Sequence, residues 1–584
     1  MSSDYKPVKV IDDRLCCTDS LGFQIFRGAT DVTCSQFQAI TQSTSNHVYN
    51  IQMPSLTTVC ARTVLNQSTV CIKLQGVPPA GKYLIDYGNT DALCPFPLNN
   101  CFSNTQCQLN STTTSSNLKD ILPSLLRAID KRDLMAYDSM TPVLCDNLLY
   151  YRDGIDTNVN VLSGFNNSID MEYTPRGAFP VLIGSGQDLN GNPTGALVLG
   201  DGAAVRTAYV QFTVSEPLIG LSPWCFGRSQ SNVQGIYGIA NMVFTFNVQP
   251  PNRVWRTANN YITSVQYAEN NPFQNSQLLF TFLTPSPSES LMPKRNVVPY
   301  AEWIAYNSPY NSSVPLPSGS SATLVTATIP LNQIPERIWL VPRKPNATLT
   351  AQDTDSCMKI NNINIQFNNQ SGLVSSATPQ DLFRMSKDAQ YNGSYYEWNG
   401  QAMRSSNLGA PITMRTSGSF TILEFGKHIQ CGASYYAPGS LGNFTIQVKV
   451  NVTNLYDEAF APEMALIVQN VGLYVIESGT SQVYSGILLR DQVLDVDKQQ
   501  GIPASEMKRL VGGSFWDSLK SVVGQVLPIA KVVSGLIPHP GAQMANKVIG
   551  SLGYGHSGGG SSGGGSSGGA LAKRTYKKTN KKDM

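Results

Sequence analysis

The chain has 584 residues, of which 41% are hydrophobic and only 14% are charged. A single hydrophobic core stops growing at roughly 250–300 residues, so this length excludes one compact core and indicates two large domains. The low charge disfavours long solvated helices, whereas 48 glycines, 35 prolines and 9% aromatic residues favour short strands joined by many turns. The predicted fold class is therefore all-β.

Residues 1–29 are interpreted as an N-terminal arm. Its first 13 residues carry several charges and no apolar stretch, so no secretion signal is expected. The 12 cysteines of the chain show no CxxC spacing, so reduced thiols are expected. A zinc site built from cysteine and histidine has no support from spacing, because the histidines are few and far apart: His47, His428, His539 and His556. No metal and no cofactor is predicted.

Residues 76–83 fit the pattern of a phosphate-binding loop except at the last position, where Tyr83 replaces the Ser or Thr that would hold magnesium. Pro78 and Pro79 also lack the N–H groups that would bind phosphate. A β-turn is predicted here.

One helix is predicted in the first half, because apolar residues recur at helical spacing: Leu118, Ile121, Leu122, Leu125, Leu126 and Ile129. Ser115 and Ser116 are its candidate caps, and Pro123 is expected to delay its regular start.

Strands are predicted wherever apolar and polar residues alternate. The clearest case is residues 444–453, in which Phe444, Ile446, Val448, Val450 and Val452 alternate with polar residues. Residues 210–214, 242–248 and 363–367 follow the same rule, and turn-forming clusters at 188–193 and 317–321 separate the runs.

The domain boundary is predicted at Gln249-Pro250-Pro251-Asn252, because paired prolines remove two strand donors in succession. On this prediction residues 30–248 and residues 253–490 each form a sandwich of about eight strands.

A different kind of sequence follows residue 490: a linker over 491–513 and then an amphipathic segment over 514–552. Its expected apolar face comprises Phe515, Trp516, Leu519, Val522, Val526, Ile529 and Val533. Pro528 is expected to kink this segment. Two interpretations remain open: a membrane-active helix, and a helix that packs against a protein partner or core.

The C-terminus consists of a flexible Gly/Ser linker, residues 553–570, and a basic tail, residues 571–584. The last twelve residues hold six basic groups and one acid, which leaves the rest of the chain at −2. We expect the tail to contact nucleic acid or another polyanion through Lys573, Arg574, Lys577, Lys578, Lys581 and Lys582. The alternative is a solubilising or nuclear-targeting tail.

No enzyme is predicted. Gly555 to Gly559 match the pattern of a nucleophile elbow, but Ser557 begins the flexible linker. Asp491, Asp495 and Asp497 lack the glycine and glutamate of a calcium loop.

Several segments in order resemble one known family. Residues 363–375, followed by Leu382-Phe383-Arg384-Met385-Ser386, look like part of the second jelly roll of the double-jelly-roll major capsid proteins of virophages and Polinton-like elements, in the lineage that includes adenovirus. Other segments keep the same family order: 216–224, 235–239, 244–247, 334–343, 425–427, 438–439 and 444–452. The resemblance spans about residues 200–455.

A second resemblance concerns the C-terminal extension. Residues 510–516, Leu-Val-Gly-Gly-Ser-Phe-Trp, resemble the site that adenovirus-type proteases cleave, which implies cleavage between Gly513 and Ser514. The following helix is similar to the lytic helix of the adenovirus internal capsid protein. Residues 182–186 fit a looser form of the cleavage pattern by chance.

The resemblance implies a viral structural protein with two eight-stranded jelly rolls in tandem. It also implies a homotrimer that forms a pseudo-hexagonal capsomer of an icosahedral virion shell, assembled in the host cytoplasm or nucleus. A minor capsid or penton protein, genomic nucleic acid and a membrane are the other expected partners. Two alternatives are a single-jelly-roll shell domain with a protruding domain, and a carbohydrate-binding multidomain β protein, which would need paired carboxylates in a cleft.

Overall fold

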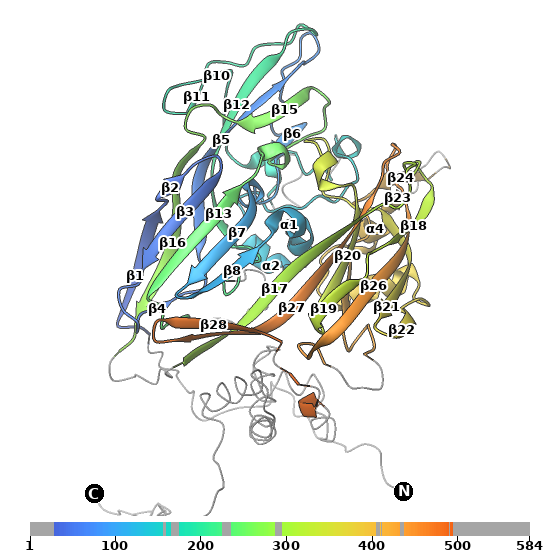
Figure 1. The fold of residues 1–584 in the computed structure, drawn as a ribbon. Helices are drawn as coiled ribbons and strands as arrows, with labels where there is room; N and C mark the ends of the chain where they lie inside the picture. The colour runs from blue at the N-terminus through green and yellow to red at the C-terminus, as the bar shows by residue number, and fades with distance from the viewer. Residues whose placement is uncertain are drawn as a thin grey trace, which may run out of the picture. The chain divides into compact units, whose positions relative to one another are not determined.

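The computed structural model describes most of the chain between the N-terminal arm and the C-terminal extension, namely residues 28–155, 159–164, 174–224, 235–286, 295–404, 409, 411–431, 437–486, 488–489 and 491–493. These residues form mostly β structure (Figure 1).

A first pair of sheets is built from eight principal strands. In chain order they are β1 (Asp31–Gln38), β3 (Asn46–Gln52), β5 (Leu65–Gly76), β7 (Phe102–Leu109), β8 (Thr112–Ser116), β12 (Arg206–Pro217), β13 (Asn241–Val248) and β16 (Phe273–Thr284). One sheet has the order β1-β16-β5-β12, and the other has the order β3-β13-β7-β8. Short strands extend these sheets or form small pairs beside them: β2 (Thr41–Gln42), β4 (Val59–Cys60), β6 (Asp91–Leu93), β9 (Leu182–Gly184), β10 (Gly186–Gln187), β11 (Pro193–Thr194), β14 (Trp255–Thr257) and β15 (Ile262–Tyr267).

A second pair of sheets repeats this plan. Its strands are β17 (Arg295–Pro309), β18 (Ser321–Val325), β19 (Ile329–Gln333), β20 (Arg337–Arg343), β21 (Lys359–Phe367), β22 (Gln370–Leu373), β25 (Thr421–Glu424), β26 (Leu441–Thr453), β27 (Glu463–Glu477) and β28 (Thr480–Ser485). One sheet has the order β17-β27-β20-β25, with β28 beside β27. In the other, β18 and β19 together occupy one place next to β26, followed by β21 and β22. A hairpin of β23 (Gln401–Arg404) and β24 (Ile412–Arg415) lies outside both sheets.

Both pairs have the same connectivity. When the eight strand positions of each pair are numbered in chain order, one sheet is 1-8-3-6 and the other is 2-7-4-5. Antiparallel strands that alternate between two facing sheets in this way form a jelly roll. The prediction of two jelly rolls is therefore confirmed, and a single jelly roll with an unrelated protruding domain is excluded. We call the two units roll 1 and roll 2.

The expected boundary at Pro250 and Pro251 is wrong. These prolines open the short 3₁₀ helix η5 (Pro251–Arg253), which lies in the connection between the seventh and eighth strands of roll 1. The eighth strand, β16, follows them and pairs with β1 and β5. Prolines stop a strand, but they do not end the sheet to which the next strand returns.

The alternating sequences form the predicted strands. In β26, Phe444, Ile446, Val448, Val450 and Val452 are all buried. Burial of each such side chain contributes roughly 1.5–3 kcal/mol, which fixes the face that β26 turns inward. The predicted strands around residues 210–214, 242–248 and 363–367 are β12, β13 and β21.

The predicted helix exists as α1 (Leu118–Leu126), but its start differs from the expectation. Ser115 and Ser116 belong to β8, and Asn117 is the N-cap residue without a side-chain capping bond. Pro123 lies inside the helix rather than delaying it, and it removes the N–H that would bond to Lys119. Other described helices are α2 (Lys131–Met135), α3 (Pro379–Asp388), α4 (Tyr395–Asn399) and the 3₁₀ helices η2 (Asn99–Cys101), η3 (Tyr151–Gly154), η4 (Arg176–Ala178) and η7 (Asn346–Thr348).

Helix α1 lies between two strands of roll 1 in the chain and packs against roll 2. Its buried residues Ile121, Leu122 and Leu125 belong to the hydrophobic core of roll 2 rather than that of roll 1. The carbonyl oxygen of Lys119, which Pro123 leaves without its helical donor, accepts a hydrogen bond of 3.2 Å from Nδ2 of Asn346 in roll 2. Asn346 of roll 2 thus replaces the helical hydrogen bond that Pro123 removes.

Candidate functional site

The site residues predicted from the sequence lie outside the described residues. This holds for the cleavage position Gly513 and Ser514, for the apolar face of 514–552, for the six basic residues of the tail, and for Ser557, Asp495 and Asp497. Asp491 is described and stands in a short helical stretch. No described helix combines the length and the hydropathy that crossing a membrane requires.

The segment at residues 76–83 forms the predicted turn. The N–H of Lys82 donates to the carbonyl oxygen of Pro79 at 3.1 Å, and Gly81 adopts a φ of 75°, which a residue with a side chain rarely adopts. The carbonyl oxygen of Gly200 accepts from the N–H of Gly81 at 3.0 Å, so this N–H is not free for a phosphate.

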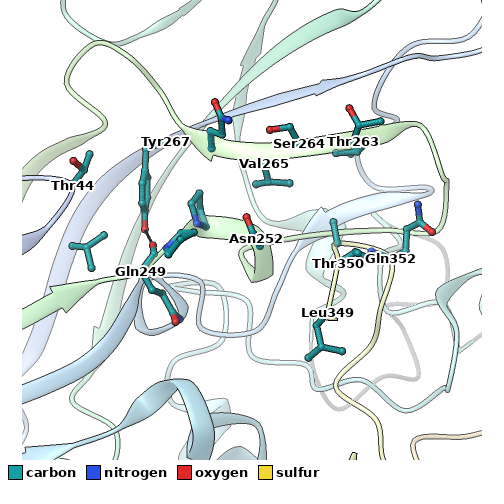
Figure 2. Close-up of a pocket in the computed structure, with 16 residues that line it drawn as sticks. Thr44, Gln249, Asn252, Thr263, Ser264, Val265, Tyr267, Leu349, Thr350 and Gln352 are labelled. Carbon is teal, nitrogen blue, oxygen red and sulfur yellow. Dashed lines mark hydrogen bonds between the residues drawn. The ribbon is translucent and has the colours of Figure 1, made fainter. Parts of the chain in front are cut away.

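One groove of about 640 Å³ lies where the connections of roll 1 meet a loop of roll 2 (Figure 2). The strand β15 forms one wall, residues 248–252 form another, and residues 349–352 of roll 2 contribute the third. The side chains that line it are uncharged throughout. The hydroxyl of Tyr267 donates to the carbonyl oxygen of Gln249 at 2.8 Å, as Figure 2 shows.

This groove does not have the chemistry of an active site. General acid–base catalysis and glycoside cleavage need carboxylates or histidines, and none lines the groove. Burial raises the pKa of Tyr267 well above its ordinary value, so this phenol does not act as a base near neutral pH. The paired carboxylates that a glycosidase requires are therefore missing from this groove.

A buried group of charged residues, which we call the junction cluster, joins the two rolls. It comprises Arg127, Asp146, Arg176, Arg253 and Arg256 of roll 1 and Asp355 of roll 2.

On the roll 1 side of the junction cluster, Asp146 makes most of the contacts. It forms a fully buried ion pair with Arg176, and it accepts a hydrogen bond of 2.9 Å from the hydroxyl of Tyr151. The backbone N–H of Asp355 donates to the same carboxylate at 2.8 Å, which links it directly to roll 2.

Asp355 faces two guanidinium groups of roll 1. Arg253 lies 2.8 Å and Arg256 lies 3.0 Å from its two carboxylate oxygens. Burial alone would raise the pKa of Asp355, but Arg256 and Arg253 outweigh it and hold the pKa well below its ordinary value. Arg127 donates to the backbone carbonyl oxygens of both Asp146 and Asp355, at 2.7 and 2.9 Å.

This cluster is the main feature that the sequence did not reveal. Its members come from five separated segments, and only pairing in space brings them together. One signal was available: Val254 and Trp255 lie between Arg253 and Arg256, and two charges beside a large apolar side chain, in a chain with so few charges, indicate a buried partner.

The described thiols and acids form no metal site. The nine described cysteines are all free, and burial raises the pKa of most of them, to about 12 for Cys94 and Cys107. Within the described ranges no group of three or more His, Cys, Asp or Glu side chains is arranged to hold a metal ion.

Comparison with known protein families identifies the kind of protein that has this architecture. The family model of the first domain of the Sputnik virophage major capsid protein matches residues 3–283, and the model of the major capsid protein V20 C-terminal domain matches residues 304–472. The chain belongs to the virophage major capsid proteins. It is therefore a structural protein of the virion that forms the capsid with copies of itself, and it is not an enzyme.

Individual relatives agree with this family. The putative capsid protein V20 of Sputnik virophage is 26% identical over 598 aligned positions, which cover 95% of each chain. The capsid chain in the cryo-EM structure of the Sputnik virophage has a TM-score of 0.74 at 23% identity, over 87% of this chain and 98% of that one. The mavirus major capsid protein has a TM-score of 0.65 at 13% identity, over 86% of this chain and all of that one. These two structures share the fold of this major capsid protein.

Proposed function

We propose that this major capsid protein forms a homotrimer and that the trimer is a pseudo-hexagonal capsomer of an icosahedral shell. The observation that carries the proposal is the repeated connectivity of the two rolls in one chain. Three such chains present six rolls of similar construction around a three-fold axis, and six similar units around an axis fit the hexagonal positions of a closed shell.

Rigid attachment of the two rolls supports this role. A capsomer must hold its six rolls at fixed angles, because neighbouring capsomers contact its flanks. The hydrophobic core of roll 1 includes Val298 and Tyr474 from strands of roll 2, and α1 of roll 1 packs in the core of roll 2. With the junction cluster, these contacts oppose rotation of one roll against the other.

Among the described residues, the outer strands of one sheet also fit an assembling protein. In roll 1, β1 and β9 lie at the two ends of the larger sheet, and β1 is exposed over its first four residues. An uncovered edge is a template for association unless something protects it. In a shell, the neighbouring copy supplies that protection.

We also propose the division of the chain into parts. Roll 1 extends from about residue 30 to Thr284, and roll 2 begins at Arg295; the two family models support a boundary between them. The N-terminal arm, the linker with its Gly513 cleavage site, the amphipathic segment 514–552 and the basic tail complete the chain. The roles proposed for the last three parts, namely processing, membrane or shell contact, and binding of genomic nucleic acid, are supported by the sequence alone.

Electron microscopy of the expressed full-length chain tests the assembly proposal. We expect three-fold particles with a pseudo-hexagonal outline and, at high protein concentration, closed or sheet-like arrays of them. A minor capsid or penton protein would be needed at the five-fold positions. A chain that stays monomeric over the same concentration range would contradict the proposal.

A further inference from the structure

The junction cluster contains more positive than negative charge. Its four arginines face two aspartates, Asp146 and Asp355, so the group has a surplus of two positive charges. Arg253 is 15% exposed and is partly solvated, but Arg176 and Arg256 are fully buried. A buried charge is stable only when a counter-charge and hydrogen bonds replace the water that it loses. The surplus therefore favours a further negative group at the cluster.

Two other carboxylates are fully buried in the described part of roll 1, but they do not balance this charge. Glu216 accepts hydrogen bonds from the backbone N–H groups of Leu98 and Asn99, at 2.9 and 2.7 Å, and Asp91 accepts from the indole N–H of Trp255 at 3.2 Å. Burial raises the pKa of both carboxyl groups above the ordinary value, which weakens them as counter-charges. Among the described residues, neither forms an ion pair with an arginine of the junction cluster.

Three guanidinium nitrogens of the junction cluster have no hydrogen-bond partner among the described residues. They are Nε of Arg176 and both Nε and Nη1 of Arg256. Buried polar groups are nearly always paired, and an unpaired one indicates a bound ion or water molecule. Guanidinium N–H groups can only donate, so the group that binds them must accept hydrogen bonds.

These two arginines are electrostatic neighbours. Burial and the positive charge of Arg256 both act to lower the pKa of Arg176, but the Asp146 carboxylate outweighs them and raises it. Both guanidinium groups also act on Tyr151 and Cys94, where burial raises the pKa and the two positive charges oppose that rise. The unpaired donors thus belong to two like charges that repel each other, and an anion beside both reduces this repulsion.

We propose that the junction cluster binds one small inorganic anion, such as chloride, at the unpaired N–H groups of Arg176 and Arg256. An anion accepts hydrogen bonds from these donors and also reduces the surplus of positive charge, whereas a water molecule does only the first. The occupant must be small because both side chains are fully buried, which excludes nucleic acid and acidic peptides. Since the cluster joins the two rolls, the anion stabilises the attachment of roll 1 to roll 2. This site does not depend on the trimer proposed above.

Bromide identifies the occupant in the unmodified full-length protein, because its anomalous X-ray signal distinguishes it from water. Crystals grown with sodium bromide in place of sodium chloride should show one anomalous peak within hydrogen-bonding distance of Nε of Arg176 and of Nε or Nη1 of Arg256. Density without an anomalous signal at this position would show a water molecule and would overturn the proposal. So would the absence of any density beside these nitrogens.

Unfolding at constant ionic strength, with gluconate replacing chloride, tests the same site in solution. One bound anion should raise the ratio of folded to unfolded protein by up to about tenfold between about 10 and 100 mM chloride. Arg256→Lys keeps the charge that pairs with Asp355 but removes both unpaired donors of this side chain, so the dependence on chloride should weaken.

Arg337→Lys is the matched control, because Arg337 pairs with Glu424 at 2.8 Å within roll 2, outside the junction cluster. This variant should keep the full dependence on chloride. A folded ratio that does not respond to chloride, or a response that Arg256→Lys leaves unchanged, would overturn the proposal. The bromide experiment uses the unmodified chain and therefore gives an answer even when Arg256→Lys does not fold.

Discussion

Replacement of Asp355 by asparagine removes the charge that joins the two rolls while keeping nearly the same shape. Asp355 is the carboxylate that pairs with both Arg253 and Arg256, and Arg256 is fully buried. The substitution removes the carboxylate paired with the fully buried guanidinium of Arg256 and with that of Arg253, and breaking a buried ion pair on one side costs about 3–5 kcal/mol. We therefore expect Asp355→Asn to lower the free energy of unfolding by this amount.

Urea unfolding followed by tryptophan fluorescence measures the effect. Asp388→Asn is the matched control, because Asp388 is 63% exposed and its ion pair with Lys427 is 3.8 Å long. An exposed pair of this kind contributes less than about 1 kcal/mol. If both substitutions lower the free energy of unfolding by equal and small amounts, the junction cluster does not hold the two rolls together.

Four further results are expected. Burial lowers the pKa of His47 to about 4 in the folded chain. Between about pH 6.5 and pH 4 the imidazole is therefore protonated in the unfolded chain but not in the folded one. The free energy of unfolding should fall as the pH drops through this range, by about 3 kcal/mol in total. His47→Phe should flatten this part of the pH profile in urea titrations, and an unchanged slope would refute the assignment. Asn346→Ala should lower the free energy of unfolding by about 1 kcal/mol, because it removes the donor that binds the Lys119 carbonyl and the Asp120 carboxylate; thermal denaturation checks this, and an unchanged unfolding temperature would show that water replaces these bonds. Deletion of residues 570–584 should reduce the nucleic acid retained by particles and weaken its salt dependence while trimers persist; equal nucleic acid content would count against the tail. A peptide of residues 514–537 should release dye from liposomes, and Val522→Asp with Val526→Asp should abolish release, whereas sealed liposomes would favour a helix that packs on protein.

The strands of this fold could be predicted because each one carries its own evidence. The alternation in β26 follows from one buried and one exposed face, which local sequence displays directly. Pairing between strands carries no such local signal. The paired prolines therefore predict a domain boundary that does not exist, because β16 returns to roll 1 after them.

The contacts of buried side chains could not be predicted from the sequence either. The apolar stripe of α1 predicted a helix, but nothing in it showed that the stripe packs in roll 2. Asp146 and Asp355 are separated by more than two hundred residues, so their link could not be predicted from spacing. The resemblance to capsid proteins supplied the fold of both rolls because it rests on the order of many segments rather than on any one of them.

The mass of the purified full-length protein tests the central claim most directly. Size-exclusion chromatography with light scattering should give about 190 kDa, which corresponds to three copies of the 63.4 kDa chain, or larger multiples of that mass. A species that remains at the mass of one chain at all concentrations would contradict the capsomer account.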